Sequence, residues 1–104
     1  MSGQHPLIRE MRDEIDTLDN QIFDLIQRRL GLCQRIGEMK ATSGLPLSDP
    51  DRESKMMARL LDRQQNELLD EATLRGIYQA ILNRSKDIQK NKETVNDRRH
   101  DLGP

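Results

Sequence analysis

Two long cationic side chains stand where an apolar helical stripe should continue. Arg29 is four residues after Leu25, and Lys40 is four residues after Ile36. The two cations are eleven residues apart, about 20° past three full helical turns, so they share one face about 16 Å apart along the axis. A buried cation needs a negative partner. The spacing therefore predicts that Arg29 and Lys40 converge on a small anion or, alternatively, that they pair with an acidic residue of the chain.

Two further groups of polar residues have helical spacing. Ser85 and Gln89 are four residues apart, so they lie on one helix face as uncharged hydrogen-bonding groups. Asp49, Arg52 and Glu53 fall within one helical turn. Both groups could bind a polar ligand. The alternatives are a polar contact between helices for the first group and a capped, solvated first turn for the second.

Arg12 has the same charge as Arg29 but lies seventeen residues before it, about 25 Å away along a straight helix. It cannot reach the same small ligand within one chain. Two interpretations remain open. Arg12 acts in the site of a second copy of the chain, or it is a solvated arginine beside Asp13 and Asp16.

The sequence offers little support for other kinds of catalysis. His5 and His100 lie in terminal segments, which argues against a histidine base or triad. Cys33, the single cysteine, continues the apolar stripe and is predicted to be a small core residue. No spacing typical of a metal site or a phosphate-binding loop occurs, so we expect neither a metal nor a cofactor.

Charge and composition exclude several classes of protein. The 17 Lys and Arg residues nearly balance the 18 Asp and Glu residues, whereas a generic nucleic-acid binder has a strongly basic face. No apolar run is long enough to span a membrane, and no apolar segment typical of a secretion signal occurs near Met1. We therefore expect a cytoplasmic protein that binds neither nucleic acid nor membranes.

The elements that must position the polar residues are all helical. Apolar residues recur at steps of three and four from Leu7 onward, which predicts a first helix over about 6–42. Asp49 is a favoured N-cap residue for a second helix that ends near residue 65. Asp70 similarly caps a third helix that ends near residue 92. The sequence therefore predicts an all-α chain of three helices, one of them long.

The length of the first helix predicts a second copy of the chain. The helix would be about 55 Å long, whereas a compact chain of this size has a radius of gyration near 13 Å. Only 34% of residues are hydrophobic and 2% aromatic, so the chain has few large side chains for a core of its own. We expect a helical domain over residues 1–92 that pairs with a second copy, and a polar, disordered tail over residues 93–104.

Taken together, these residues resemble the all-helical chorismate mutases, the AroQ class, over about residues 6–90. The likeness is carried by an ordered set of segments: Leu7–Arg12, Ile36–Lys40 and Pro46–Glu53, followed by Ile81, Ser85 and Gln89. The resemblance implies an intertwined homodimer of three-helix chains with two equivalent sites. It also implies the Claisen rearrangement of chorismate to prephenate, on the route to phenylalanine and tyrosine, without cofactor, metal or covalent intermediate.

The resemblance carries roles onto eight residues: Arg12, Arg29, Lys40, Asp49, Arg52, Glu53, Ser85 and Gln89. Lys40 and Gln89 would be catalytic, because they would donate hydrogen bonds to the ether oxygen that gains negative charge. Arg29 and Arg12 of the partner subunit would bind the two substrate carboxylates. The remaining residues would bind substrate: Glu53 and Asp49 at the ring hydroxyl, Ser85 at a carboxylate, and Arg52 as a neutralising wall of the pocket.

Two other functions are compatible with the same residues. An isochorismate pyruvate lyase could use much the same cationic cage on the same scaffold. In a non-enzymatic interaction module, Arg29, Lys40 and Gln89 would be polar residues of an interface, and their replacement would alter dimerisation alone. The group at the start of the second helix, together with Ser85, favours the mutase. Incubation with chorismate and with isochorismate would separate the two enzymes.

Overall fold

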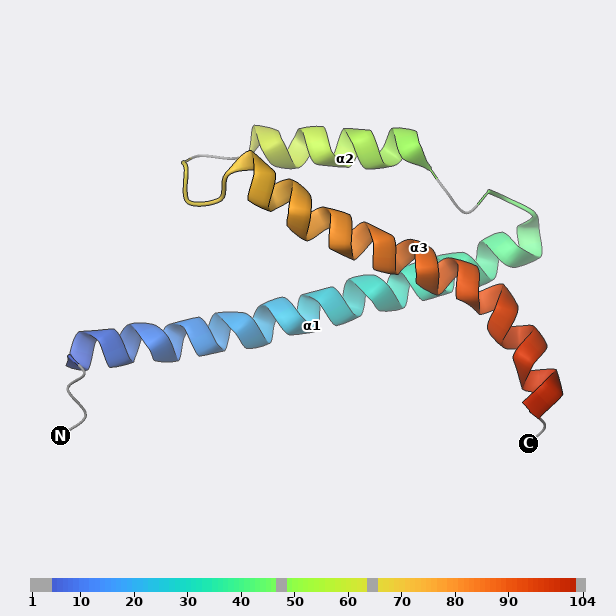
Figure 1. The fold of residues 1–104 in the computed structure, drawn as a ribbon, viewed down its shortest axis with the longest axis horizontal. Helices are drawn as coiled ribbons and strands as arrows, with labels where there is room; N and C mark the ends of the chain where they lie inside the picture. The colour runs from blue at the N-terminus through green and yellow to red at the C-terminus, as the bar shows by residue number, and fades with distance from the viewer. Residues whose placement is uncertain (1–4, 47–48, 64–65, 103–104) are drawn as a thin grey trace.

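The structure is a computed structural model that describes residues 5–46, 49–63 and 66–102 (Figure 1). It contains three helices, α1 (Pro6–Ser43), α2 (Pro50–Asp62) and α3 (Glu71–Leu102), and the described residues include no strand. The predicted all-α class with one long helix is confirmed. No helix among these residues combines the length and apolar character needed to cross a bilayer.

Local capping interactions set both ends of α1. Nδ1 of His5 accepts a hydrogen bond from the backbone N–H of Leu7 at 3.1 Å, and Pro6 occupies the first helical position. At the other end, Gly44 has φ 71°, a left-handed conformation that glycine adopts without steric cost, and its N–H bonds the carbonyl of Lys40. The predicted helix over about 6–42 agrees with these ends to within one residue.

Aspartates cap the other two helices, as predicted. Oδ1 of Asp49 accepts a hydrogen bond from the N–H of Arg52 at 3.1 Å, and Pro50 begins α2. Oδ1 of Asp70 accepts from the N–H of Thr73 at 2.7 Å, and hydrogen bonds from the side chain and backbone of Thr73 lower the pKa of Asp70 below its ordinary value of 3.8. Helix α2 ends at Asp62, three residues before the predicted end near residue 65, which lies outside the described residues.

The end of α3 differs from the sequence prediction. The helix continues to Leu102, although the segment from residue 93 was predicted to be a disordered tail. The prediction rested on the low apolar content of this segment, which is too little for it to pack. A helix, however, is propagated by backbone hydrogen bonds, and residues 93–102 contain no Gly or Pro to interrupt them. The domain boundary after residue 92 stays a prediction.

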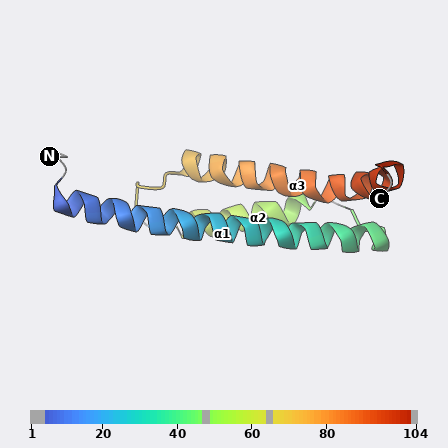
Figure 2. The same ribbon diagram turned by 90° about the horizontal axis from the view of Figure 1, so that it is seen from below.

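Helix α3 joins the fold together because it packs on both other helices. It runs beside α2 and then crosses the C-terminal half of α1, as Figures 1 and 2 show. The crossing requires Gly37, since a Cβ atom at this position would lie 2.9 Å from the Cα atom of Gln89. The absence of a side chain at Gly37 therefore lets α3 approach the backbone of α1 closely.

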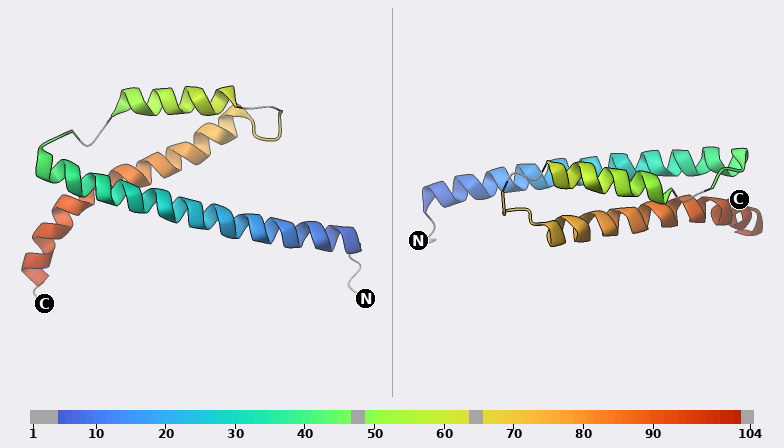
Figure 3. Two further views of the ribbon diagram at one scale, coloured as in Figure 1. Left: turned by 180° about the vertical axis from the view of Figure 1, so that it is seen from behind. Right: turned by 90° about the horizontal axis from the view of Figure 1, so that it is seen from above.

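The N-terminal half of α1 has no partner helix within the described chain. It extends beyond α2 and α3 (Figure 3), and the chain has a radius of gyration of 19.1 Å rather than the approximately 13 Å of a compact fold. The predicted apolar stripe is present here but more than half exposed at each position: Leu7, Met11, Ile15, Leu18, Ile22 and Leu25. Among the described residues Leu74 is the one buried large apolar side chain, so a single chain has little core of its own.

Candidate active site

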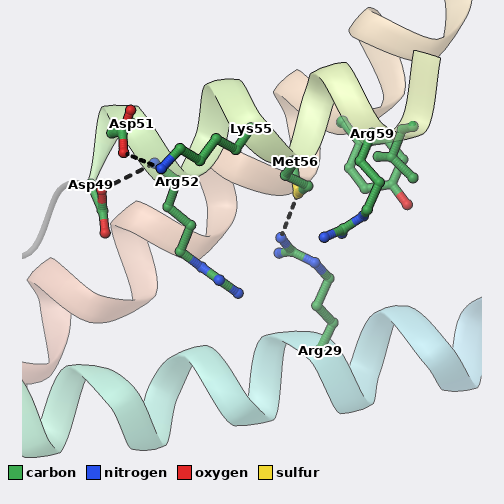
Figure 4. Close-up of a pocket in the computed structure, with 9 residues that line it drawn as sticks. Arg29, Asp49, Asp51, Arg52, Lys55, Met56 and Arg59 are labelled. Carbon is green, nitrogen blue, oxygen red and sulfur yellow. Dashed lines mark hydrogen bonds and ion pairs between the residues drawn. The ribbon is translucent and has the colours of Figure 1, made fainter. Parts of the chain in front are cut away.

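A cavity of about 380 Å³ lies between the C-terminal half of α1, the start of α2 and the middle of α3. Seven of the eight residues implied by the resemblance line it: Arg29, Lys40, Asp49, Arg52, Glu53, Ser85 and Gln89. A second cavity, of about 600 Å³, adjoins it on the other side of Arg29 and is drawn in Figure 4. Arg29, Asp49, Arg52 and Met56 line both cavities, so the two form neighbouring parts of one polar region.

Arg29 reaches from α1 across to α2 and α3 (Figure 4). Nη1 donates to Oγ of Ser85 at 3.0 Å and lies 4.0 Å from Sγ of Cys33, while Nη2 lies 3.7 Å from Sδ of Met56. Each of these partners is neutral. The half-buried guanidinium therefore keeps a charge that a bound anion would balance, which favours the anion over an acidic residue as its partner.

Ser85 is 4% exposed, and its hydroxyl both donates and accepts a hydrogen bond. It donates to the carbonyl of Ile81 at 2.8 Å and accepts from Nη1 of Arg29. A hydroxyl has one proton to donate, and here the proton is used within α3. Ser85 thus forms the polar contact between helices that the sequence left as an alternative, and this contact orients Arg29 toward the cavity.

Gln89 presents an unpaired polar atom at the cavity. The residue is 9% exposed, and its Oε1 is buried with no hydrogen-bond partner in the described part of the chain. Leaving a buried polar atom unpaired costs about 1–3 kcal/mol. A rotation of the amide by 180° would place the NH2 donor at this position instead. A ligand that accepts a hydrogen bond here would remove the penalty.

The charges around the cavity suit a dianion. Four cationic side chains line it (Arg29, Lys40, Arg52 and Lys86) against two carboxylates (Asp49 and Glu53), an excess of two positive charges. Figure 4 shows the side chain of Arg52 extending from α2 toward α1. Apolar side chains complete the wall: Leu32, Cys33, Ile36, Met56 and Leu82. The cavity can therefore hold a small ring that bears two carboxylates.

Residues 11–90 match the family model described as chorismate mutase type II. The chain belongs to the type II chorismate mutase family. Its all-α fold is the one that the resemblance to this family implied.

Individual members of the family are similar over nearly their whole length. The chain is 33% identical over 91 residues to the chorismate mutase of Methanocaldococcus jannaschii, an alignment that covers 86% of this chain and 92% of that protein. It is 34% identical over 104 residues to a 4-amino-4-deoxychorismate mutase of Streptomyces venezuelae, covering 95% and 100%. The crystal structure of Helicobacter pylori chorismate mutase in complex with prephenate superposes with a TM-score of 0.72 at 30% identity, covering 86% and 97%.

These matches favour a mutase over the lyase and the interaction module that the sequence left open. Arg12, the eighth residue implied by the resemblance to this family, lines neither cavity and lies exposed on the uncovered half of α1. This position agrees with the distance of about 25 Å from Arg29 that helical rise requires.

The family resemblance missed some residues of the cavity wall. Lys86 lies three residues before Gln89 and four after Leu82, so the same helical spacing that selected Gln89 could have found it. Cys33, predicted as a core residue, is half-buried and lines the cavity. It follows the apolar stripe, but that stripe borders a cavity at this point rather than a filled core.

Proposed function

We propose that the chain catalyses the rearrangement of chorismate to prephenate, on the route to phenylalanine and tyrosine, within the cavity between its three helices. The observation that carries the proposal is the excess of two positive charges at this cavity, where Arg29 has neutral partners among the described residues. Chorismate is a dicarboxylate whose charge matches that excess. The family assignment supports the same reaction.

The reaction is pericyclic, so it needs no acid, base or nucleophile. The site has to hold the side chain of the substrate over its ring and to stabilise negative charge on the ether oxygen as the C–O bond breaks. Arg29 and Arg12 of the partner subunit bind the two carboxylates. Lys40 donates to one carboxylate and to the ether oxygen, and the amide of Gln89 donates to the same oxygen.

The remaining polar residues act around this core of contacts. Ser85 acts through Arg29, because its hydroxyl holds the guanidinium at 3.0 Å. Asp49 caps α2 and thereby positions Arg52 and Glu53, which follow it in the first turn. Arg52 neutralises the wall of the cavity, and Glu53 accepts the hydrogen bond of the ring hydroxyl.

The proposal includes an intertwined homodimer. The exposed apolar stripe on α1 would be buried by a second copy, and Arg12 on the same half of the helix lines neither of the two cavities described above. A second copy lying on this stripe would bring Arg12 to the cavity of its partner. The cytoplasmic localisation predicted from the sequence stays a prediction.

The test of the proposed function is the loss of chorismate absorbance, with prephenate identified as the product and isochorismate assayed in parallel. Lys40→Ala should lose more than about 100-fold in kcat/KM, because a donor aimed at developing charge contributes about 3–4 kcal/mol. Lys40→Arg should retain more activity than Lys40→Ala but still lose most of it, since a guanidinium has a different donor geometry. A Lys40→Ala enzyme within threefold of the parent would remove this residue from the mechanism.

A second candidate is the same rearrangement of 4-amino-4-deoxychorismate. The similarity to the Streptomyces venezuelae protein favours it, because that alignment covers the whole of the relative. The two substrates share both carboxylates and the breaking bond and differ in one ring substituent. An assay of both compounds with the same enzyme preparation separates the two candidates.

A further inference from the structure

An ion pair between two helices faces the cavity. Nζ of Lys86 on α3 lies 3.3 Å from Oε1 of Glu53 on α2, and both side chains line the cavity. Their side chains are 44% and 28% exposed, respectively. Two other ion pairs each lie within one helix: Lys55 with Asp51 on α2, which also line the larger cavity, and Arg75 with Glu71 on α3. The pair of Lys86 and Glu53 is therefore placed to contact a ligand.

With chorismate as the proposed substrate, the ring hydroxyl is the group that fits beside this ion pair. This step rests on the proposed function. The ring hydroxyl of chorismate is its one hydrogen-bond donor, and two carboxylates line the cavity to accept it. Oδ1 of Asp49 is engaged by the N–H of Arg52 as the cap of α2. Glu53 also has one oxygen engaged, by Lys86, but it is half-buried whereas Asp49 is exposed, so the second oxygen of Glu53 is the better-shielded acceptor for the hydroxyl.

We propose that Lys86 is a specificity-determining residue that admits a neutral ring hydroxyl beside Glu53 and disfavours a ring ammonium. An alkyl amine is protonated at neutral pH, so 4-amino-4-deoxychorismate would bring a second cation to a carboxylate that Lys86 already neutralises. Like charges in a partly desolvated cavity repel each other. Discrimination between close analogues commonly depends on such a repulsive element.

The test compares kcat/KM for chorismate and for 4-amino-4-deoxychorismate in the parent, Lys86→Met and Lys86→Arg. Methionine keeps much of the length of lysine without its charge, and arginine keeps the charge. The parent should prefer chorismate by about 100-fold or more. Lys86→Met should reduce this preference at least tenfold, through a gain on the amino substrate, and Lys86→Arg should retain the parent preference.

A pH series adds a readout that a purely structural role of Lys86 would not change. In the parent, turnover of the amino substrate relative to chorismate should rise as the pH passes the pKa of the amine, because the neutral amine no longer repels Lys86. In Lys86→Met this rise should be smaller. Lys90→Met is the matched control, since Lys90 is exposed on the same helix and outside the cavity lining. It should keep the parent preference at every pH.

Three outcomes would overturn the inference: equal turnover of both substrates by the parent, a preference within twofold of the parent in Lys86→Met, or the same change in Lys86→Arg as in Lys86→Met. Circular dichroism shows whether each variant is folded, and Lys86→Gln replaces Lys86→Met if the latter does not fold. Failure of the proposed function gives a different result, because the parent would then convert no chorismate; turnover of the amino compound alone would instead support the second candidate and overturn the inference.

Discussion

The two halves of α1 have the same apolar periodicity but different surroundings. In the N-terminal half, Leu18 and Ile22 are 54% and 52% exposed, and no helix of the described chain covers them. In the C-terminal half, Gly37 is buried against α3, and Arg29 and Lys40 line the cavity. A helical stripe therefore indicates an apolar face without indicating whether the same chain covers it.

The difference extends to the cationic residues of the two halves. Arg29, in the covered half, is held by Ser85 at 3.0 Å, whereas Arg12, in the uncovered half, lines neither cavity. In the proposed dimer both halves of α1 contribute to catalysis. The C-terminal half contributes to the site of its own chain, and the N-terminal half contributes Arg12 to the site of the second copy.

The largest effect should follow from a charge on the uncovered stripe. Ile22→Lys would place an ammonium in the proposed interface, where an unpaired charge costs several kcal/mol. About 4 kcal/mol corresponds to about 1,000-fold, so we expect loss of the dimer in analytical ultracentrifugation and at least that loss in kcat/KM. Asn20→Lys, on the polar face of the same segment, should leave both unchanged. A monomeric Ile22→Lys enzyme with parent activity would show that the N-terminal half of α1 needs no second copy of the chain to cover it.

Mixing two inactive variants tests whether the two halves serve different sites. Arg12→Ala and Lys40→Ala, exchanged into one dimer, should restore up to about half of the parent activity per heterodimer. One of its sites would contain both defects and the other neither. The control mixture of Arg29→Ala and Lys40→Ala should stay inactive, because both residues line one cavity of the same chain and each site would contain one defect. Equal results from the two mixtures, with subunit exchange proven, would contradict the trans role of Arg12.

The next effect concerns Gln89, which lies against the covered half of α1 at Gly37. Gln89→Glu should lose about 100-fold in kcat/KM at pH 7.5, because a carboxylate repels charge growing on the ether oxygen instead of donating to it. Activity should recover as the pH falls and the acid, whose unperturbed pKa is about 4.3, becomes protonated. Burial raises this pKa and the neighbouring cations lower it, so the direction of the change is the prediction.

The measurement for Gln89→Glu is kcat/KM from about pH 4.5 to 8, a range that brackets the expected protonation, with circular dichroism as the folding control. Gln79→Glu is a matched variant, since Gln79 is exposed on α3 and donates to Oδ1 of Asn83 at 2.8 Å. It should follow the parent profile. A Gln89→Glu profile parallel to that of the parent would place Gln89 away from the breaking bond.

The smallest expected effect tests the close contact of α1 with α3. Gly37→Ala should lower kcat about tenfold, because its Cβ would push the backbone of Gln89 away by about half an ångström or more, and small misplacements of catalytic groups are costly. Gly31→Ala, on the same helix with no atom within 4 Å of the added Cβ, should keep full activity and gain up to about 1 kcal/mol in stability.

A double-mutant cycle shows whether Gly37 acts through Gln89. In a Gln89→Ala background, Gly37→Ala should cost little further activity, because contacting residues that act together are non-additive. Additive losses in kcat would show that Gly37 has only a structural role.

Much of the secondary structure could be predicted because its signals are local. Asp49 and Asp70 accept hydrogen bonds from residues three positions ahead, and Gly44 ends α1 through its own φ angle. The structure extends α3 to Leu102, beyond the predicted end near residue 92, for a related reason. The low apolar content of residues 93–102 says little about helix propagation, which depends on neighbouring backbone groups.

The candidate site shows the same difference between relations within one helix and contacts between helices. Helical spacing by itself determined that Arg29 and Lys40 share a face, that Ser85 and Gln89 share another, and that Arg12 is too far along the helix to join them. The contacts between these faces were decided only by the tertiary structure: Arg29 with Ser85, Glu53 with Lys86, and Gly37 with Gln89. The physical reason is range. A helix fixes relations over three or four residues, whereas partners on different helices depend on where those helices cross, and that crossing is set by packing between them.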